Sequence, residues 1–266
     1  MSDLRITTVQ TDLVWENPRA NYDLIAGHLK TIDNPTDLIV LPEMFTTGFS
    51  MRPEETAEKF HVDMNTILWM RERAREHHAA IVGSVSVEEE GKYYNRMIWV
   101  EPNGPVQWVD KRHRFSMGHE DRSFGAGSRK LIVNYKGWNI LPLVCYDLRF
   151  PVWCRNRLVE GKPEYDLALF AANWPETRVI HWTKLLMARA IENQSYVAGV
   201  NRVGLDANDI PHSGGTAVID PMGEVIQSHP DNTQSVKTTL LEAEFLQKVR
   251  RYLSFLKDGD QFHIDL

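Results

Sequence analysis

Apolar and polar positions follow two different periods along the chain. Nearly continuous apolar runs and strict apolar–polar alternation are typical of β-strands, whereas apolar residues spaced three and four apart are typical of helices. The pattern predicts strands at 4–10, 37–43, 106–111, 166–174, 195–203 and the start of 236–257, and hairpins at 80–102, 130–147 and 216–229. It predicts helices after Asn17, where Pro18 takes the first helical position, at 63–78, 151–160 and 179–194, and at the end of 236–257.

Strands therefore alternate with helices, but several hairpins are mixed in. Parallel sheets need crossover connections, so a purely parallel doubly wound sheet does not suit this order. Two mixed sheets stacked on each other, with helices outside, would bury the strands on both faces. We expect an α/β sandwich. The chain shows no 20–50-residue repeat, low-complexity tract or linker, so residues 1–266 are expected to form a single domain.

Composition narrows the class of function. The 266 residues are 42% hydrophobic and 25% charged, with a net charge of -6, which gives no basic surface for nucleic acid. No apolar run approaches the roughly 18 residues needed to span a bilayer. The start, MSDLRITTVQTDLVW, lacks the basic head and apolar centre of a signal peptide. With only two cysteines there is no disulfide framework. A cytoplasmic protein with no nucleic-acid or membrane partner is expected.

Candidate chemistry appears where the most apolar strands end. Glu43 follows DLIVLP, Lys111 follows VQWVD, and Cys145 follows ILPLV. Catalytic groups gather outside the ends of buried strands, because the sheet fixes their backbone while the loops leave room for a ligand. If the three ends converge, Cys145 is the nucleophile, its thiol made more acidic by a helix N-terminus and nearby cations.

The other two side chains would serve this nucleophile. Glu43 would take the thiol proton and later give it to a leaving amine. Lys111 and the backbone N–H of Tyr146 would stabilise the oxygen of a tetrahedral intermediate. Each residue also has an ordinary reading, because a buried Cys is often core filling and Glu or Lys in a loop is often solvated. Cys154 is expected to be structural.

Three other readings compete with this one. In a Cys-His hydrolase, Cys145 would pair with one of the histidines, among them His113, His119, His181 and His212. In a metal site, His113 and His119 would act with Glu120 and Asp121, although the cysteine and histidine spacings of zinc sites are absent from the sequence. A homologue that lost its chemistry would keep the fold alone.

The residues around these three positions resemble the nitrilase superfamily of carbon–nitrogen hydrolases. LPEMFTTGF, DKRHRF and VCYDLRFP match, in order, the segments that carry the family's base, lysine and nucleophile. This resemblance covers the whole chain and implies a four-layer α-β-β-α sandwich with no metal or organic cofactor. It also implies a homodimer, the assembly that members of the superfamily commonly form. It also implies that Glu120 is a second glutamate that contacts the lysine and helps to position the substrate.

Within the superfamily, Tyr146 stands where nitrilases proper usually have Trp, and the segments EMFTTGFSM, CYDLRFP and ANWP look most like omega-amidases. That resemblance implies hydrolysis of the terminal amide of 2-oxoglutaramate or 2-oxosuccinamate to the dicarboxylate and ammonia. Another small-amide or N-carbamoyl amino acid hydrolase is the alternative. The substrate carboxylate needs a cation, for which the candidates are Arg178 and, second, Arg202. The candidate aromatic walls of the pocket are Phe45, Phe124 and Trp174.

Overall fold

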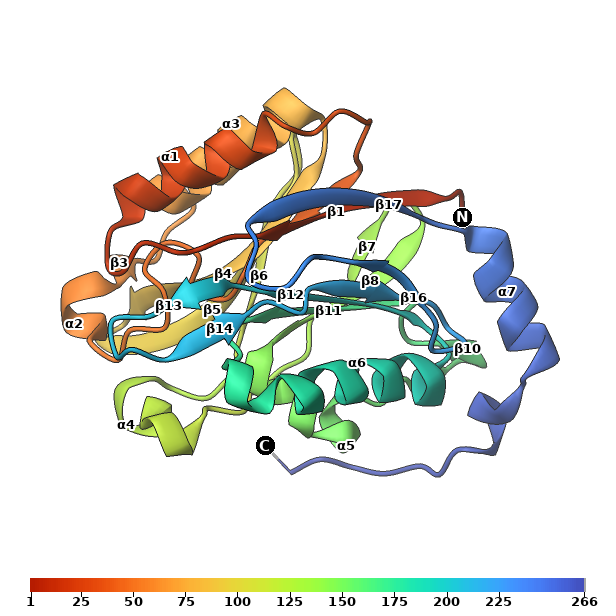
Figure 1. Ribbon diagram of the computed structural model, residues 1–266. Coiled ribbons are helices and arrows are strands. Elements are labelled where there is room, and N and C mark those ends of the chain that lie inside the picture. Colours follow the sequence, from red (N-terminus) through yellow and green to blue (C-terminus); the bar gives the residue numbers. More distant parts are fainter. Residues whose placement is uncertain (266) are drawn as a thin grey trace.

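The computed structural model describes residues 1–265 as two stacked mixed β-sheets with helices outside (Figure 1). The first sheet has the strand order β17-β1-β2-β4-β5-β6, and the short β3 (Glu58–Lys59) pairs with β4. Its strands are β1 (Leu4–Gln10), β2 (Leu38–Val40), β4 (Ala80–Glu89), β5 (Lys92–Val100), β6 (Val106–Asp110) and β17 (Ser235–Leu241).

The second sheet has the strand order β16-β15-β12-β11-β8-β7. Its strands are β7 (Val133–Tyr135), β8 (Trp138–Val144), β11 (Leu167–Ala172), β12 (Tyr196–Asn201), β15 (Ala217–Ile219) and β16 (Val225–Ser228). Strands β8, β11 and β12 are mutually parallel. Strand β7 pairs antiparallel with β8, β15 antiparallel with β12, and β16 antiparallel with β15. Two small hairpins, β9 (Leu158–Val159) with β10 (Lys162–Pro163) and β13 (Val203–Leu205) with β14 (Pro211–Ser213), stand apart from the sheets.

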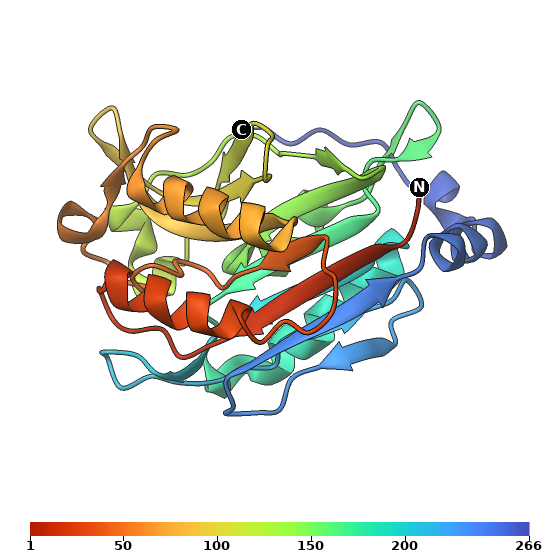
Figure 2. The same ribbon diagram turned by 90° about the horizontal axis from the view of Figure 1, so that it is seen from above.

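Helices cover both outer faces. In Figure 2, α1 (Pro18–Leu29) and α3 (Asn65–His77) lie side by side over the first sheet, while α6 (Val179–Asn193) lies under the second sheet in Figure 1. The α7 helix (Ala243–Tyr252) lies beside the sandwich. Short helical turns complete the fold: α2 (Pro53–Thr56), α4 (Glu120–Ser123), α5 (Pro151–Cys154), and the 3-10 helices η1 (Ser116–Gly118), η2 (Cys145–Arg149), η3 (Glu176–Arg178) and η4 (Phe255–Asp258).

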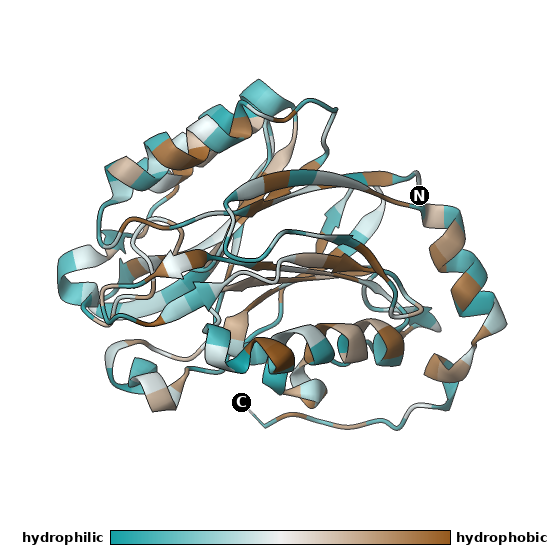
Figure 3. Ribbon diagram, viewed as in Figure 1, coloured by the Kyte–Doolittle hydropathy of each residue, from teal (hydrophilic) through white to brown (hydrophobic). Residues whose placement is uncertain are grey.

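Apolar side chains fill the space between these layers, and Figure 3 shows the apolar colour concentrated on the strands. One buried cluster joins Leu4, Ile6 and Val40 of the first sheet to Leu141 and Leu143 of the second. A separate cluster packs the other face of the first sheet against α1 and α3. The expected α-β-β-α sandwich is therefore confirmed. Among residues 1–265, no helix has the length and apolar character that crossing a lipid bilayer requires.

The predicted elements agree with this architecture except at one helix and several short segments. Asn17 caps α1 as expected, since its side chain accepts a hydrogen bond from the Ala20 N–H at 3.1 Å. The predicted helix 151–160 is wrong beyond Cys154. There the Asn156 side chain donates to the carbonyls of Tyr165 and Asn193, both at 2.9 Å, and these contacts take the chain out of the helix. The β13–β14 hairpin was not predicted.

Candidate active site

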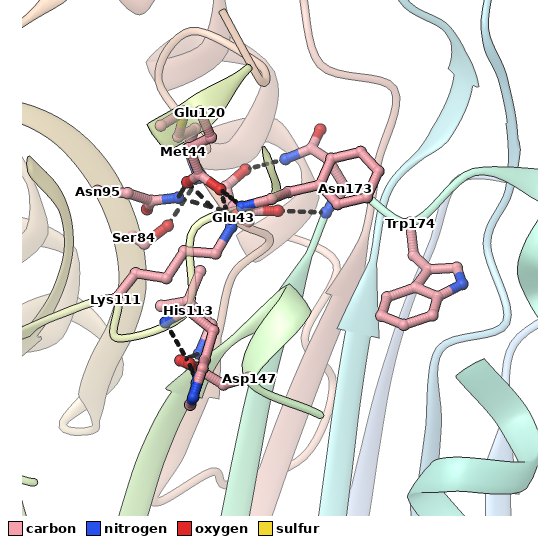
Figure 4. Close-up of polar contacts among 12 residues, drawn as sticks. Glu43, Met44, Ser84, Asn95, Lys111, His113, Glu120, Asp147, Asn173 and Trp174 are labelled. Carbon is pink, nitrogen blue, oxygen red and sulfur yellow. Dashed lines mark hydrogen bonds and ion pairs between the residues drawn. The ribbon is translucent and has the colours of Figure 1, made fainter. Parts of the chain in front are cut away.

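The ends of four strands meet at one end of the sandwich. Strands β2 and β6 run in the same direction in the first sheet, and β8 and β11 run in the same direction in the second. Glu43 lies in the turn after β2, Lys111 directly after β6, Cys145 directly after β8 and Asn173 directly after β11. The stacking of the sheets therefore places groups far apart in sequence around one space (Figure 4).

A buried ammonium group joins two carboxylates at this end. The Lys111 Nζ atom donates to Glu43 Oε1 at 2.8 Å and to Glu120 Oε2 at 2.8 Å, with Glu120 Oε1 at 3.0 Å (Figure 4). All three residues are at most 2% exposed. Because two carboxylates and one ammonium carry one uncompensated negative charge, the cluster needs further hydrogen-bond donors.

Two asparagines that the sequence did not single out supply those donors. Asn95, in the middle of β5, donates from Nδ2 to Glu43 Oε1 at 2.9 Å and to Glu120 Oε1 at 3.1 Å. The Asn173 backbone N–H donates to Glu43 Oε2 at 2.8 Å, and its side-chain amide donates to the Glu43 carbonyl. Both oxygens of the Glu43 carboxylate are therefore fixed in direction.

The cluster sets the charge states of its members. Burial alone would lower the pKa of Lys111, but the carboxylates of Glu120 and Glu43 outweigh burial and raise it, so the ammonium stays charged. Burial raises the pKa of Glu120, Lys111 opposes that shift and Glu43 adds to it, and the net direction is upward. Lys111 is thus a permanent cation held between two acids.

Cys145 stands at a sharp turn beside this cluster. It begins η2 with a φ of +42°, a left-handed conformation that non-glycine residues seldom adopt, and its side chain lines the same cavity as Lys111. The sequence favoured a more acidic thiol, and that expectation is wrong. Burial raises the pKa of Cys145 well above its ordinary value, and the Glu43 carboxylate raises it further, while Lys111 opposes both only in part. The thiol therefore keeps its proton in the free protein.

The cavity beside Cys145 has a volume of about 140 Å³, which is small beside the roughly 300–1,000 Å³ of sites for drug-sized ligands. Trp174 and Arg178 line the cavity, as predicted, and Tyr146 lies on its wall. Further lining residues that the sequence did not indicate are Phe49, Met51, Phe115, Arg149, Asp206 and Ile210, and His212, a candidate only in the Cys-His reading, also lines the cavity. The site is thus a small hollow with aromatic walls, the cationic side chains of Lys111, Arg149 and Arg178, and one aspartate.

Three residues that the sequence predicts to bind the substrate, Phe45, Phe124 and Arg202, lie outside this cavity. Phe45 is fully buried in the layer between the first sheet and the helices, where its ring lies 5.9 Å from that of Trp69. The turn at Met44, with a φ of +44°, sends it there. Phe124 is 3% exposed and does not line the cavity. It follows α4, the short helix that carries Glu120 towards Lys111.

The second candidate cation, Arg202, is also a structural residue. Its guanidinium pairs with Asp12 at 2.7 Å and donates to the Val203 carbonyl at 3.0 Å and the Leu205 carbonyl at 3.0 Å. These bonds tie the β13–β14 hairpin to the end of β1, so the charge of Arg202 is already used. Cys154, predicted to be structural, is fully buried and donates from its S–H to the Asp147 carbonyl at 3.2 Å.

The geometry gives little support to a metal site or to a Cys-His hydrolase. Glu120 is occupied by Lys111 and His113 by Asp147, and residues 1–265 contain no cluster of three His, Cys, Asp or Glu placed to hold a metal ion. His212 does line the cavity, but burial lowers its pKa to about 4 and its Nδ1 faces the Ile210 carbonyl at 3.0 Å. The charged groups that act most on the Cys145 thiol are Glu43, Lys111 and Glu120.

Comparison with known proteins gives the same picture over the whole chain. Residues 5–251 match the model of the carbon–nitrogen hydrolase family. The omega-amidase YafV of Escherichia coli K12 is 44% identical over 99% of this chain and 100% of its own, and a 2-oxoglutaramate amidase of Bacillus subtilis is 32% identical over 83% and 84%.

A solved structure agrees with these relatives. A carbon–nitrogen hydrolase superfamily protein of Xanthomonas campestris, crystallised with an arsenic adduct in its active site, matches with a TM-score of 0.96 and 44% identity over 100% of both chains. The resemblance to the nitrilase superfamily is thus confirmed by overall fold, by sequence along nearly the full length, and by a family model. The chain belongs to the carbon–nitrogen hydrolase family.

Proposed function

We propose that the protein is a thiol amidohydrolase that cleaves the terminal amide of a small carboxylate-bearing substrate, of the 2-oxoglutaramate or 2-oxosuccinamate type, to the acid and ammonia. The names of the relatives support the substrate class. The observation that carries the chemistry is the Lys111 ammonium, which contacts both Glu43 and Glu120 on the wall of the cavity that Cys145 lines. We further propose that residues 1–266 act as one domain.

The first half of the reaction makes a thioester. Because the Cys145 thiol is protonated in the free protein, Glu43 takes its proton as the sulfur attacks the amide carbon. The carbonyl oxygen becomes an oxyanion that receives hydrogen bonds from Lys111 and from the Tyr146 N–H, which as an early N–H of η2 has no partner inside that helix. Glu43 then passes the proton to the nitrogen, the C–N bond breaks and ammonia leaves.

The second half hydrolyses the thioester. Glu43, again a carboxylate, takes a proton from a water molecule whose oxygen attacks the thioester carbon. The same donors stabilise the second oxyanion, which collapses with release of the acid, and the proton returns from Glu43 to the sulfur. Glu120 does not exchange protons in this scheme. Its two carboxylate oxygens accept hydrogen bonds from the Lys111 ammonium, which helps to hold that ammonium beside the cavity.

Two arginines would bind the substrate carboxylate. Arg178 and Arg149 both line the cavity, with the Arg178 guanidinium 5.5 Å from the centre of the Phe115 ring and that of Arg149 4.5 Å from the Trp174 ring. Neither forms an ion pair with any carboxylate of residues 1–265. Because a guanidinium can bind a carboxylate through two hydrogen bonds, these side chains are available for an anionic substrate in a way that Arg202 is not.

Ammonia release from a panel of small compounds tests this function. We expect kcat/KM to be highest for 2-oxoglutaramate or 2-oxosuccinamate, lower for asparagine, and lowest for a nitrile. A clear preference for an N-carbamoyl amino acid would instead support the alternative within the same family. Release of ammonia from none of them would refute the proposal.

The arginines are tested separately from the chemistry. Arg149→Gln and Arg178→Gln should each raise KM for the anionic amide by about 10- to 100-fold, the worth of a charge-assisted hydrogen bond of roughly 1.5–3 kcal/mol. Turnover of a neutral amide should change little. Arg75→Gln, on the exposed face of α3, is the matched control. Equal losses on charged and neutral amides would remove the arginines from substrate binding.

The resemblance also supports a homodimer that works in the cytoplasm, and both remain part of the proposal. Sedimentation at micromolar concentration separates a dimer from a monomer, and fractionation of cells that produce the protein tests its compartment. A monomeric, fully active enzyme would contradict the first.

A further inference from the structure

One buried carboxylate connects the turn that carries Cys145 to the loop that carries Lys111. Asp147, which is 2% exposed, accepts a hydrogen bond from the Val144 N–H on Oδ2 at 3.1 Å. Its Oδ1 accepts from the His113 N–H at 2.9 Å and lies 2.8 Å from the His113 ring Nδ1 (Figure 4). Since a carboxylate accepts, the ring Nδ1 carries the proton in this contact.

The His113 ring is fixed on a second side by aromatic packing. It lies parallel to the Phe150 ring, with centroids 3.6 Å apart and an interplanar angle of 6°, and the Trp153 ring meets it edge-on at 5.9 Å. Phe150 and Trp153 follow directly on the turn that begins at Cys145. His113 is therefore attached to that segment through its backbone, its ring nitrogen and its ring face.

The contact between His113 and Asp147 matters because each residue lies close in sequence to a residue of the active site. His113 comes two residues after Lys111, and Asp147 comes two residues after Cys145. Both Lys111 and Cys145 lie just past the last residue of a strand, and the two strands, β6 and β8, belong to different sheets. The distance between the two side chains is therefore set by contacts between the sheets, and the Asp147–His113 contact is one that joins the two loops directly.

Neither side chain of this link can act on the substrate directly. The residues that line the cavity include Lys111, Cys145 and Tyr146 but not His113 or Asp147. Any effect of the link on the reaction must pass through the placement of the sulfur and the ammonium. Displacements of about 1 Å at a reacting group can cost on the order of 100-fold in rate.

We propose that His113 and Asp147 form a positioning clasp, the His113–Asp147 clasp, that sets the separation of Cys145 from Lys111 and Glu43. This inference deepens the proposed function, on which it rests. The clasp does not exchange protons with the substrate. It holds the backbone of the nucleophile turn, strained at Cys145, against the loop whose lysine receives the oxyanion.

Two substitutions separate the parts of the clasp. His113→Phe keeps a ring that can stack on Phe150 but removes the donor to Asp147. His113→Asn keeps a donor near the position of Nδ1 but removes the ring. We expect His113→Phe to lower kcat by about 10- to 100-fold with KM changed by less than about threefold, and His113→Asn to recover most of the lost kcat. A kcat loss that is the same in both variants would overturn the role of the polar contact.

A second readout needs no substrate. The pH profile of Cys145 alkylation by iodoacetamide depends on how Glu43 and Lys111 act on the pKa of the thiol, so we expect His113→Phe to shift this profile and His113→Asn to restore it. If the wild-type protein hydrolyses no amide, the proposed function fails, whereas this comparison still tests the clasp. A His113→Phe profile at the wild-type position would refute the clasp.

The control is a buried histidine remote from the cavity. His229 is 5% exposed and its ring nitrogens contact Thr8 at 2.8 Å and Ser235 at 2.5 Å. His229→Leu should lower stability without changing kcat or alkylation of the folded protein. If it changes both as His113→Phe does, loss of stability explains the result and the clasp is excluded. Phe150→Leu, which removes the stacking surface, gives an independent second test and should lower kcat by a smaller factor.

Discussion

Replacement of Lys111 by Met tests whether the buried cluster is electrostatically coupled. In the protein, Glu43 Oε1 and Glu120 Oε1 lie within 3.0 Å of the same Nζ atom, so these two oxygens are less than about 6 Å apart. Without the ammonium, the two buried carboxylates retain only the amide of Asn95 as a shared donor. Each lost contact of 2.8 Å corresponds to about 6 kcal/mol of attraction at an effective dielectric constant of about 20.

The net effect on folding is smaller, because the ammonium is also relieved of its desolvation cost. Removal of one partner from a buried ion pair typically costs about 3–5 kcal/mol, and we expect that loss in the free energy of unfolding of Lys111→Met at alkaline pH. Lys111→Met/Glu120→Gln should regain much of it, since only one carboxylate then remains. We expect kcat to fall by at least about 100-fold in both variants.

The stability loss of Lys111→Met should depend on pH, and the pKa of Glu120 sets the direction of that dependence. The pKa of Glu120 is already raised in the protein, and it rises further when the opposing lysine is removed. An acid with a raised folded-state pKa contributes stability below its unfolded value, near 4.5, and loses that contribution as pH rises through the folded pKa. The deficit of Lys111→Met should therefore be largest at high pH and shrink as pH falls.

Urea unfolding followed by tryptophan fluorescence, repeated from about pH 6 to pH 9, measures this deficit. Lys130→Met is the control, because the Lys130 ammonium lies 3.9 Å from Glu164 and contributes only a weak pair. A Lys111→Met protein as stable as wild type, or one whose deficit does not vary with pH, would refute the coupling.

Three shorter predictions concern the two cysteines and Glu43. One equivalent of iodoacetamide should label Cys145 well before Cys154, since Cys145 lines the cavity whereas Cys154 is fully buried; equal labelling, read by peptide mass, would contradict this. In Glu43→Gln, the alkylation profile of Cys145 should move to lower pH, because the Glu43 carboxylate helps burial to raise that pKa, and a profile at the wild-type position would show that the two groups are not coupled. The same variant should lose at least about 100-fold in kcat in ammonia release, since it lacks the base that we propose, and wild-type turnover would show that Glu43 is not required.

Strand ends could be read from the sequence because a buried strand has a strong apolar signal that stops at a definite residue. Glu43, Lys111 and Cys145 were selected on that signal, and the structure brings them to one end of the sandwich. Asn95 gives no such signal: it lies inside β5, where the alternating pattern treats it as an ordinary polar position. In the structure it is 1% exposed, and its side-chain amide donates to Glu43 and Glu120.

The direction in which a side chain points after a turn could not be predicted from the sequence for a related reason. Phe45 and Phe49 both follow Glu43 in one short segment, yet Phe45 enters the core and Phe49 lines the cavity. Met44, directly before Phe45, has a left-handed conformation, and methionine has no tendency to such a conformation that a pattern could detect. Likewise, whether Arg178 or Arg202 is free depended on Asp12, which is distant in sequence.

The expectation of an acidic Cys145 thiol is wrong for the same reason, since the pKa of this thiol depends on residues distant in sequence. Its raised pKa changes how the proposed nucleophile must work. Local sequence placed cations and a helix start near Cys145, but not two buried carboxylates. A thiolate in the free protein would add a second uncompensated negative charge to a cluster that already carries one, at a position that is only 8% exposed. The free-energy cost of this buried thiolate is avoided if the proton leaves the sulfur only as the negative charge moves to the amide oxygen. In the proposed mechanism, Lys111 and the Tyr146 N–H stabilise that oxygen. Glu43 then takes up the proton as this charge forms, so deprotonation and attack belong to one step.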